Sequence, residues 1–142
     1  MTINELQDEI IEDFTLLDDW MDRYQLLIDL GEDEDDLSED EKVDANLIEG
    51  CQSRVWLVCD EVDGVLEYRA ESDALIVKGI AVLLMRVLSG HTPQEILEAD
   101  LYFIDKIGLS EHLSPTRSNG LLAMVKQMRM YALAYQTKLA QG

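Results

Sequence analysis

RVWLVCDEVDGVLEYRA, residues 54–70, is the stretch of the sequence that decides the fold. It contains two runs with the β-branched and aromatic content of strands, Arg54 to Val62 and Val65 to Ala70. The dipeptide Asp63-Gly64 between them is a strong signal for a two-residue hairpin turn. The sequence therefore predicts an antiparallel β-hairpin in the middle of the chain.

The first of these strands alternates in character. Side chains on a strand point to opposite faces in turn, so Val55, Leu57 and Cys59 share one apolar face. Cysteines on such faces are usually buried and inert. We therefore expect Cys59 to be a structural thiol.

Helical patterns precede the hairpin. Thr2 and Glu5 have the three-residue offset of a capping box, which predicts a helix at the start of the chain. Apolar residues then recur at helical spacing as far as Leu30, and Gly31 is a natural stop. The pattern fits one helix or two helices with a bend near residues 16–19.

A second helical pattern follows the hairpin. Ser72 is placed to cap it, with Asp73 in its first turn. Residues 74–85 are apolar almost all round, so this helix is expected in the interior, covering the apolar face of the hairpin. Gly79 in its middle indicates close packing against another backbone, and Ser89-Gly90 marks its end.

The remainder of the chain also reads as helical. Thr92-Pro93-Gln94-Glu95 is a capping box with proline at the first helical position. A further turn of helix is expected over residues 102–107, stopped by Gly108. Residues 113–120 read as a polar turn, and the final helix is expected from Leu121 onward.

This order of elements predicts an α+β fold, with a small antiparallel sheet packed against helices. At 142 residues the chain is expected to form a single domain, residues 1–142, and 47% hydrophobic residues suffice for a core.

The charge of the chain excludes several functions. A formal net charge of −19 repels nucleic acids and anionic membrane surfaces. The acidic run from Glu32 to Glu41 is expected to be a solvated loop, with a docking surface as the alternative. The acidic N-terminus is unlike a signal peptide, and no apolar run reaches about 18 residues, so we expect a cytoplasmic protein.

Metal and hydrolase chemistry are not favoured. Two cysteines are too few for a disulfide framework, and with only His91 and His112 beside them no zinc-binding spacing occurs. We expect both histidines to be surface or hydrogen-bonded structural residues. Neither lies in a recognisable thiol-hydrolase context with Cys51.

Cys51 is the candidate reactive residue. It follows Gly50 between the acidic run and the first strand, which indicates a loop at a sheet edge. The surrounding carboxylates are expected to raise its pKa. The groups that could oppose them are Arg54, Lys78, Arg117 and the N-terminus of the helix near Ser72. The alternative, which we favour, is a thiol that stays unreactive until a basic partner surface activates it.

Three separated blocks resemble the SufE-type sulfur acceptors, the Fe–S metabolism associated proteins that partner cysteine desulfurases. The resemblance runs from about Trp20 to the C-terminal helix. Its blocks are Asn46 through Trp56 with Gly50-Cys51-Gln52-Ser53, then Ser72-Asp73-Ala74 through Gly79, then Leu113, Pro115, Arg117-Ser118 and Gly120.

The resemblance implies the fold shared with IscU-type scaffolds and a role for Cys51 as persulfide acceptor. The sulfur would come from a SufS-like cysteine desulfurase and pass on to Fe–S scaffold proteins. It further implies that Gly50, Gln52 and Ser53 form the mobile loop, with Asp73, Lys78 and Arg117 around it. No cofactor is expected on this chain beyond a transient persulfide, whereas the desulfurase would carry pyridoxal phosphate (PLP). The chain would activate the desulfurase by transpersulfuration and would not itself be an enzyme.

Two other functions fit the sequence. One is an acidic adaptor that binds a partner without thiol chemistry, and the other is a thiol redox sensor. A homodimer is also compatible with the sequence. The chain departs from the family pattern in two places. One is the acidic run from Glu32 to Glu41, which bears on partner docking, and the other is the second thiol, Cys59, to which we assign no function.

Overall fold

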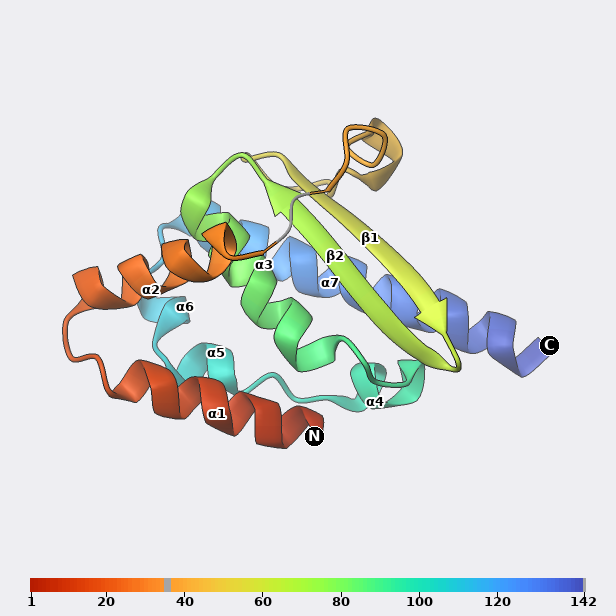
Figure 1. The fold of residues 1–142 in the computed structure, drawn as a ribbon, viewed down its shortest axis with the longest axis horizontal. Helices are drawn as coiled ribbons and strands as arrows, with labels where there is room; N and C mark the ends of the chain where they lie inside the picture. Colours follow the sequence, from red (N-terminus) through yellow and green to blue (C-terminus); the bar gives the residue numbers. More distant parts are fainter. Residues whose placement is uncertain (35–36, 142) are drawn as a thin grey trace.

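The computed structural model describes residues 1–34 and 37–141. Its elements are α1 (Ile3–Thr15), α2 (Trp20–Glu32), the 3-10 helix η1 (Asp44–Asn46), β1 (Val55–Val62), β2 (Val65–Ser72), α3 (Leu75–Leu88), α4 (Pro93–Glu98), α5 (Phe103–Lys106), α6 (Leu109–His112) and α7 (Pro115–Gln141). Figure 1 shows the hairpin lying across the helices, and the predicted α+β fold is confirmed. None of the described helices is long and apolar enough to cross a membrane.

The hairpin has the predicted turn. β1 and β2 pair antiparallel, from Val62 opposite Val65 to Val55 opposite Ser72. Asp63 and Gly64 both have positive φ, 53° and 88°. A type I′ turn requires this conformation at both central residues.

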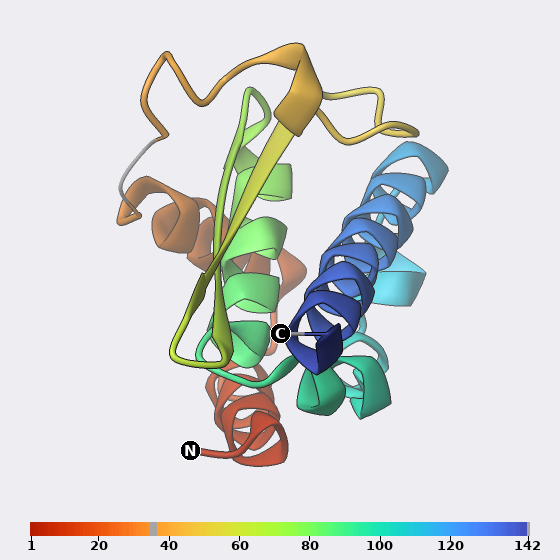
Figure 2. The same ribbon diagram turned by 90° about the vertical axis from the view of Figure 1, so that its right-hand side faces the viewer.

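The inner face of the hairpin packs on the helices. Val55, Leu57 and Cys59 are all buried, as the alternation predicts. α3 lies against β2 and also contacts α7, which in turn contacts β1. Figure 2 shows α3 behind the hairpin and α7 beside it. The expectation of an interior helix under the hairpin is therefore confirmed.

α2 and α3 cross at two glycines. A Cβ at Gly79 would lie 2.1 Å from the carbonyl oxygen of Leu27, so no side chain fits there. The predicted close packing at Gly79 is confirmed. The prediction that Gly31 ends the helix is wrong, because α2 continues to Glu32 and a Cβ at the buried Gly31 would lie 3.1 Å from the Gly79 nitrogen.

The N-terminal helical pattern forms two helices. The Thr2–Glu5 capping box starts α1 as predicted. The chain bends after Thr15, and Asp19 then caps α2 by accepting a hydrogen bond from the Met21 amide at 2.9 Å. Of the two alternatives, the structure therefore shows two helices with a bend between them.

The predicted start of α3 is wrong by two residues. β2 continues through Ser72, which pairs with Val55, so the sheet takes residues that the pattern assigned to the helix. α3 begins at Leu75, and its N-cap Ala74 has no side-chain hydrogen bond. Asp73 lies ahead of the helix rather than in its first turn.

The predicted start of the last helix is also wrong. Most of the expected polar turn is helical, because α7 begins at Pro115. Proline suits the first helical position, and the Ser114 hydroxyl accepts a hydrogen bond from the Arg117 amide at 3.3 Å. The Thr92 capping box of α4 and the stop at Gly108, with φ of 79°, are confirmed.

The acidic run is only partly solvated. Glu39 and Asp40 are exposed, but Leu37 is buried, and Glu41 accepts hydrogen bonds from the Arg69 guanidinium on β2. These bonds, helped by the Ser38 amide, lower the pKa of Glu41 to about 2. The part of the prediction that concerns residues 35–36 lies outside the described residues.

Candidate functional site

Residues 49–54 form a loop that is fastened at its base. The Ile48 amide donates a hydrogen bond to the Val55 carbonyl at 2.8 Å, and Leu47 forms a β-bridge with Trp56. Within the loop Gly50 has φ of 93°, a left-handed conformation that favours glycine. Its two ends are therefore held together while Cys51 lies near its tip.

Asp73 holds the C-terminal end of this loop. Its carboxylate accepts a hydrogen bond from the Arg54 amide at 3.1 Å, and its own amide donates to the Arg54 carbonyl at 3.3 Å. Asp73, which belongs to the second sequence block, thus contacts the end of the loop that carries the first block.

The Cys51 thiol is half-buried inside a very small cavity. Its Sγ donates a hydrogen bond to the Gly120 carbonyl at 3.7 Å. The cavity has a volume of about 10 Å³ and is lined by Cys51, Gln52, Ser53, Val77, Thr116, Arg117 and Gly120. This is about the space that one water molecule needs, so no organic substrate fits beside the thiol.

Burial raises the pKa of the Cys51 thiol. A thiol with a raised pKa is almost fully protonated at neutral pH and is a weak nucleophile in this conformation. The buried Cys59 is more strongly affected, since burial and the neighbouring Asp60 raise its pKa to about 12. Both cysteines are free thiols, and Cys51 is the more accessible of the two.

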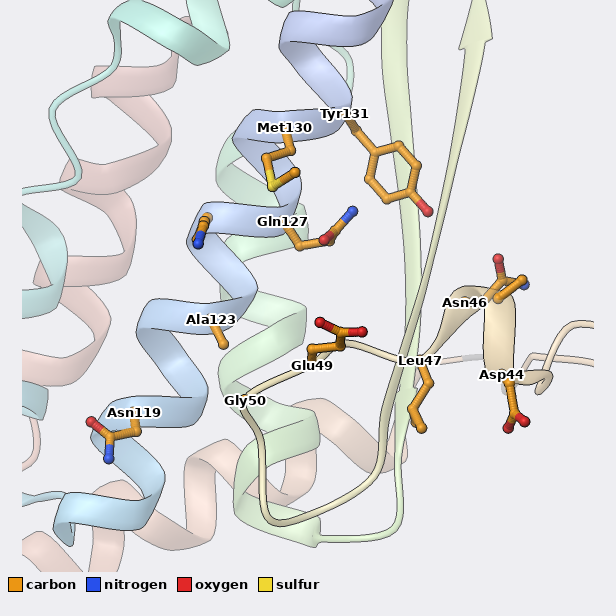
Figure 3. A pocket seen from close by; sticks show the side chains of 12 residues that line it. Asp44, Asn46, Leu47, Glu49, Gly50, Asn119, Ala123, Gln127, Met130 and Tyr131 are labelled. Atoms are coloured by element: carbon orange, nitrogen blue, oxygen red, sulfur yellow. The ribbon is translucent and has the colours of Figure 1, made fainter.

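A larger groove lies on the other side of the loop. It has a volume of about 680 Å³ and runs between residues 44–50 and α7. Figure 3 shows Ala123 and Gln127 of α7 lying across from Glu49 and Gly50. Gly50 lines this groove whereas the Cys51 side chain lines the small cavity, so the loop separates the two.

The structure brings together most of the predicted site residues. Cys51, Gln52, Ser53 and Arg117 line one cavity, with Gly50 next to it and Asp73 at the end of the loop. Lys78 does not line the cavity around Cys51. Its ammonium forms a buried ion pair with Glu71 at 3.2 Å, in a cavity that also includes Trp56 and Asp73.

Sequence reasoning misses Val77, Thr116 and Gly120 as parts of this cavity. Gly120 is visible in the third block, but the residue types of that block favour a turn. Because it is helical instead, it presents the Gly120 carbonyl to the thiol. Val77 belongs to the second block, but neither its residue type nor that of Thr116 indicates a site, since only the packing of α3 and α7 brings them to the loop.

The two histidines are structural, as expected. His91 is buried, with its ring nitrogens 3.3 Å from the Leu88 carbonyl oxygen and 2.9 Å from that of Met1. His112 stacks on Trp20 with ring centroids 3.9 Å apart. Neither lines the cavity around Cys51. In the part of the chain that is described, no three His, Cys, Asp or Glu side chains are grouped to hold a metal ion.

We expect Asp73→Ala to make Cys51 react faster with iodoacetamide, by about fivefold. The reason is that the Asp73 hydrogen bond holds the loop in the conformation in which the thiol is half-buried. Losing a bond of about 1 kcal/mol raises the population of loop conformations that expose the thiol by about fivefold. The measurement is the alkylation rate at constant pH, with Asp13→Ala on the exposed side of α1 as the matched control. Equal rates for Asp73→Ala and the unchanged chain would show that this contact does not restrain the loop.

Comparison with known proteins identifies relatives of this chain. A family model described as the SufE Fe–S metabolism associated domain matches residues 8–132. An uncharacterized SufE-like protein of Rhizobium meliloti is 41% identical over 130 residues, which cover 88% of this chain and 93% of that protein. One of Synechocystis is 37% identical over 134 residues, covering 94% of this chain and 84% of that protein.

A solved structure shares the fold. The solution structure of a hypothetical protein from Thermus thermophilus matches with a TM-score of 0.76 at 24% identity. The match covers 93% of this chain and 96% of that one. At this identity the likeness concerns the fold alone.

Proposed function

Because this chain belongs to the SufE family of Fe–S metabolism associated domains, we propose that residues 1–142 form a single sulfur-acceptor domain whose acceptor is Cys51. Family membership establishes a sulfur-related role in Fe–S metabolism. The finer proposal is that Cys51 takes persulfide sulfur from a cysteine desulfurase, stimulates that enzyme and passes the sulfur on for Fe–S cluster assembly.

The observation that carries the proposal is a half-buried thiol near the tip of a loop that is fastened at both ends. The cavity around Cys51 has only about 10 Å³ of free volume, so a reaction partner cannot reach the thiol inside it. The thiol–carbonyl contact with Gly120 and the Asp73 contacts tie this loop to α7 and to the end of β2. A loop that can leave these few contacts suits a carrier, which must deliver its thiol to another protein.

The transfer step is an exchange without net oxidation. The Cys51 thiolate attacks the terminal sulfur of the donor persulfide and forms a new S–S bond. The S–S bond of the donor breaks, and the donor cysteine leaves with the electron pair as a thiolate. The proton released by Cys51 ends on the donor thiolate, so one sulfur atom has moved and both sides remain balanced.

The environment of Cys51 supports activation by the partner. Inside its cavity the thiol has a raised pKa because burial disfavours the charged form. Leaving the cavity removes this penalty, and basic groups on the donor would lower the pKa further. While the thiol stays in the cavity, its burial and its raised pKa protect it from unwanted oxidation. Arg117 lines the cavity, and we propose that its guanidinium steadies the thiolate or its persulfide once the loop moves.

The partner supplies the remaining chemistry. A SufS-like desulfurase with its own PLP would generate the persulfide, and Fe–S scaffold proteins would receive the sulfur from Cys51. The acidic surface of this chain, at a net charge of −19, favours partners with basic docking elements.

Sulfide release by a cognate desulfurase tests the proposal, with and without this chain, in the presence of cysteine and a reductant. A sulfur acceptor increases the rate with a saturable dependence on its concentration. An adaptor without thiol chemistry leaves the rate unchanged at saturation. A redox sensor would instead show reversible peroxide oxidation of Cys51 and no stimulation, and either of these two results would contradict the proposal.

A further inference from the structure

α7 as a whole carries a net positive charge in a chain that is otherwise acidic, and two of its basic residues, Lys126 and Arg129, lie on the side where the α4 helix packs against it. α7 contains no Asp or Glu, and it holds four of the 11 basic residues. These four are Arg117, Lys126, Arg129 and Lys138. All 30 acidic residues lie in other segments together with the other seven basic residues, so the net charge of this helix is positive and that of the rest of the chain is strongly negative.

The side of α7 that carries Lys126 and Arg129 also exposes large apolar side chains. Leu122, Met130 and Leu133 are 66%, 52% and 55% exposed. With Leu97 of α4 they line an apolar cleft of about 420 Å³, which we call the α4–α7 cleft. Its other lining residues are Val125, Lys126 and Arg129, and none of the described lining residues is acidic.

α7 therefore has two apolar sides, of which the chain covers one. Leu121, Met124, Met128 and Ala132 face the core and are buried. Leu122 and Leu133 lie on a neighbouring side, because each follows a core position by one step of about 100° around the helix. Contiguous exposed apolar surface next to charged residues is typical of a docking site for another protein.

We propose that the α4–α7 cleft binds an acidic amphipathic helix of a partner protein. Leu122, Met130 and Leu133 recur along one side of α7, which is the pattern that receives the apolar stripe of a helix in a groove. Carboxylates beside that stripe would reach Lys126 at the edge of the cleft. Arg129 is fixed there by its hydrogen bond to the Ala99 carbonyl at 2.8 Å, so its charge is already in place.

The charges favour a different protein over a second copy of this chain. A symmetric dimer through the cleft would place the same patch on itself, so Lys126 and Arg129 would face their own copies. A head-to-tail contact could use the acidic surface of another copy, but two chains at −19 repel each other overall. A partner that is acidic only along one helix avoids both penalties.

The cleft lies next to the Cys51 loop without including it. Lys126 and Met130 line both the cleft and the groove beside Gly50. Leu122 follows Gly120, the thiol's hydrogen-bond partner, by two residues, and the cleft extends along α7 to Leu133, roughly 20 Å from Gly120 at 1.5 Å per residue. Cys51 is not among the residues that line the cleft, and the inference does not depend on the sulfur-acceptor function.

The test uses the full chain, labelled with ¹⁵N, and two synthetic peptides of about 18 residues, long enough to be helical. One carries leucines on one side and glutamates beside them, and the other has lysines in place of the glutamates. We expect the acidic peptide to shift amide signals of α4 and α7 and to bind more weakly as salt is added. Leu133→Glu and Lys126→Glu should each reduce its affinity at least about fivefold, a loss of about 1 kcal/mol.

Leu16→Glu is the matched control, since Leu16 is 78% exposed on another part of the surface, and it should leave the affinity unchanged. The inference is overturned if the lysine peptide binds α7 as tightly, or if Leu16→Glu weakens binding as much as Leu133→Glu does. It is also overturned if no shift occurs up to about 1 mM peptide, a very weak limit of affinity. A dimer of the unchanged chain that Leu133→Glu dissociates would identify a second copy as the occupant and likewise overturn it. Sulfur uptake by Cys51, measured in parallel, reports separately on the acceptor function.

Discussion

Cys51→Ser is expected to reduce the stimulation of sulfide release to the level of the desulfurase alone. Serine is close to cysteine in size and can keep the hydrogen bond to the Gly120 carbonyl, so the loop should keep its conformation. Its hydroxyl is not ionised at neutral pH and cannot hold a persulfide. We therefore expect full loss of stimulation, with an affinity for the desulfurase that stays within about twofold because the docking surface is unchanged.

Cys59→Ala is the matched control for that experiment. It removes the other thiol of the chain, which is buried on the inner face of β1 with a pKa of about 12. We expect it to keep the stimulation and to lose about 1 kcal/mol of stability through the small cavity it leaves. Stimulation that persists in Cys51→Ser but disappears in Cys59→Ala would contradict the assignment of the acceptor.

Gly79→Ala is expected to lower the free energy of unfolding by about 3 kcal/mol, the upper part of the range for overpacked cores. The added methyl group would lie 2.1 Å from the Leu27 carbonyl oxygen, which is backbone and cannot rotate away. α2 and α3 must then separate, and this costs more than the roughly 1 kcal/mol that alanine gains over glycine in a helix. The measurement is urea unfolding followed by circular dichroism.

Gly120→Ala provides the control with the same chemical change. Gly120 is also buried in a helix, but a Cβ there would meet the Cys51 Sγ at 3.7 Å, an ordinary contact. We expect a neutral effect or stabilisation of up to about 1 kcal/mol. If both variants unfolded at the same urea concentration, close approach at Gly79 would not be what holds α2 against α3.

The parts of the fold that are predictable from the sequence have local causes. The Asp63-Gly64 turn, the two threonine capping boxes and the alternation of β1 each depend on residues within a few positions of one another. The errors at helix starts arise where a partner element decides the outcome. Ser72 is a good helix cap by type, but pairing with Val55 keeps it in β2.

The candidate site divides in the same way. Gly50, Cys51 and the candidate cation Arg117 are evident from the residues themselves, and the family resemblance adds Asp73. The structure places Arg117 and Asp73 beside the loop. Lys78 is a reasonable candidate cation by sequence position. Its helix instead directs it to Glu71, because a buried ammonium needs a carboxylate partner and β2 supplies one.

The central claim is tested most directly by the mass of this chain after incubation with a cognate desulfurase and cysteine. The account predicts a gain of about 32 Da, one sulfur atom in the exchange proposed for the thiol. After alkylation and digestion, this mass should be on the peptide that contains Cys51 and absent from the one that contains Cys59. A desulfurase that binds the chain and carries its own persulfide, yet leaves Cys51 at its original mass, would contradict the account.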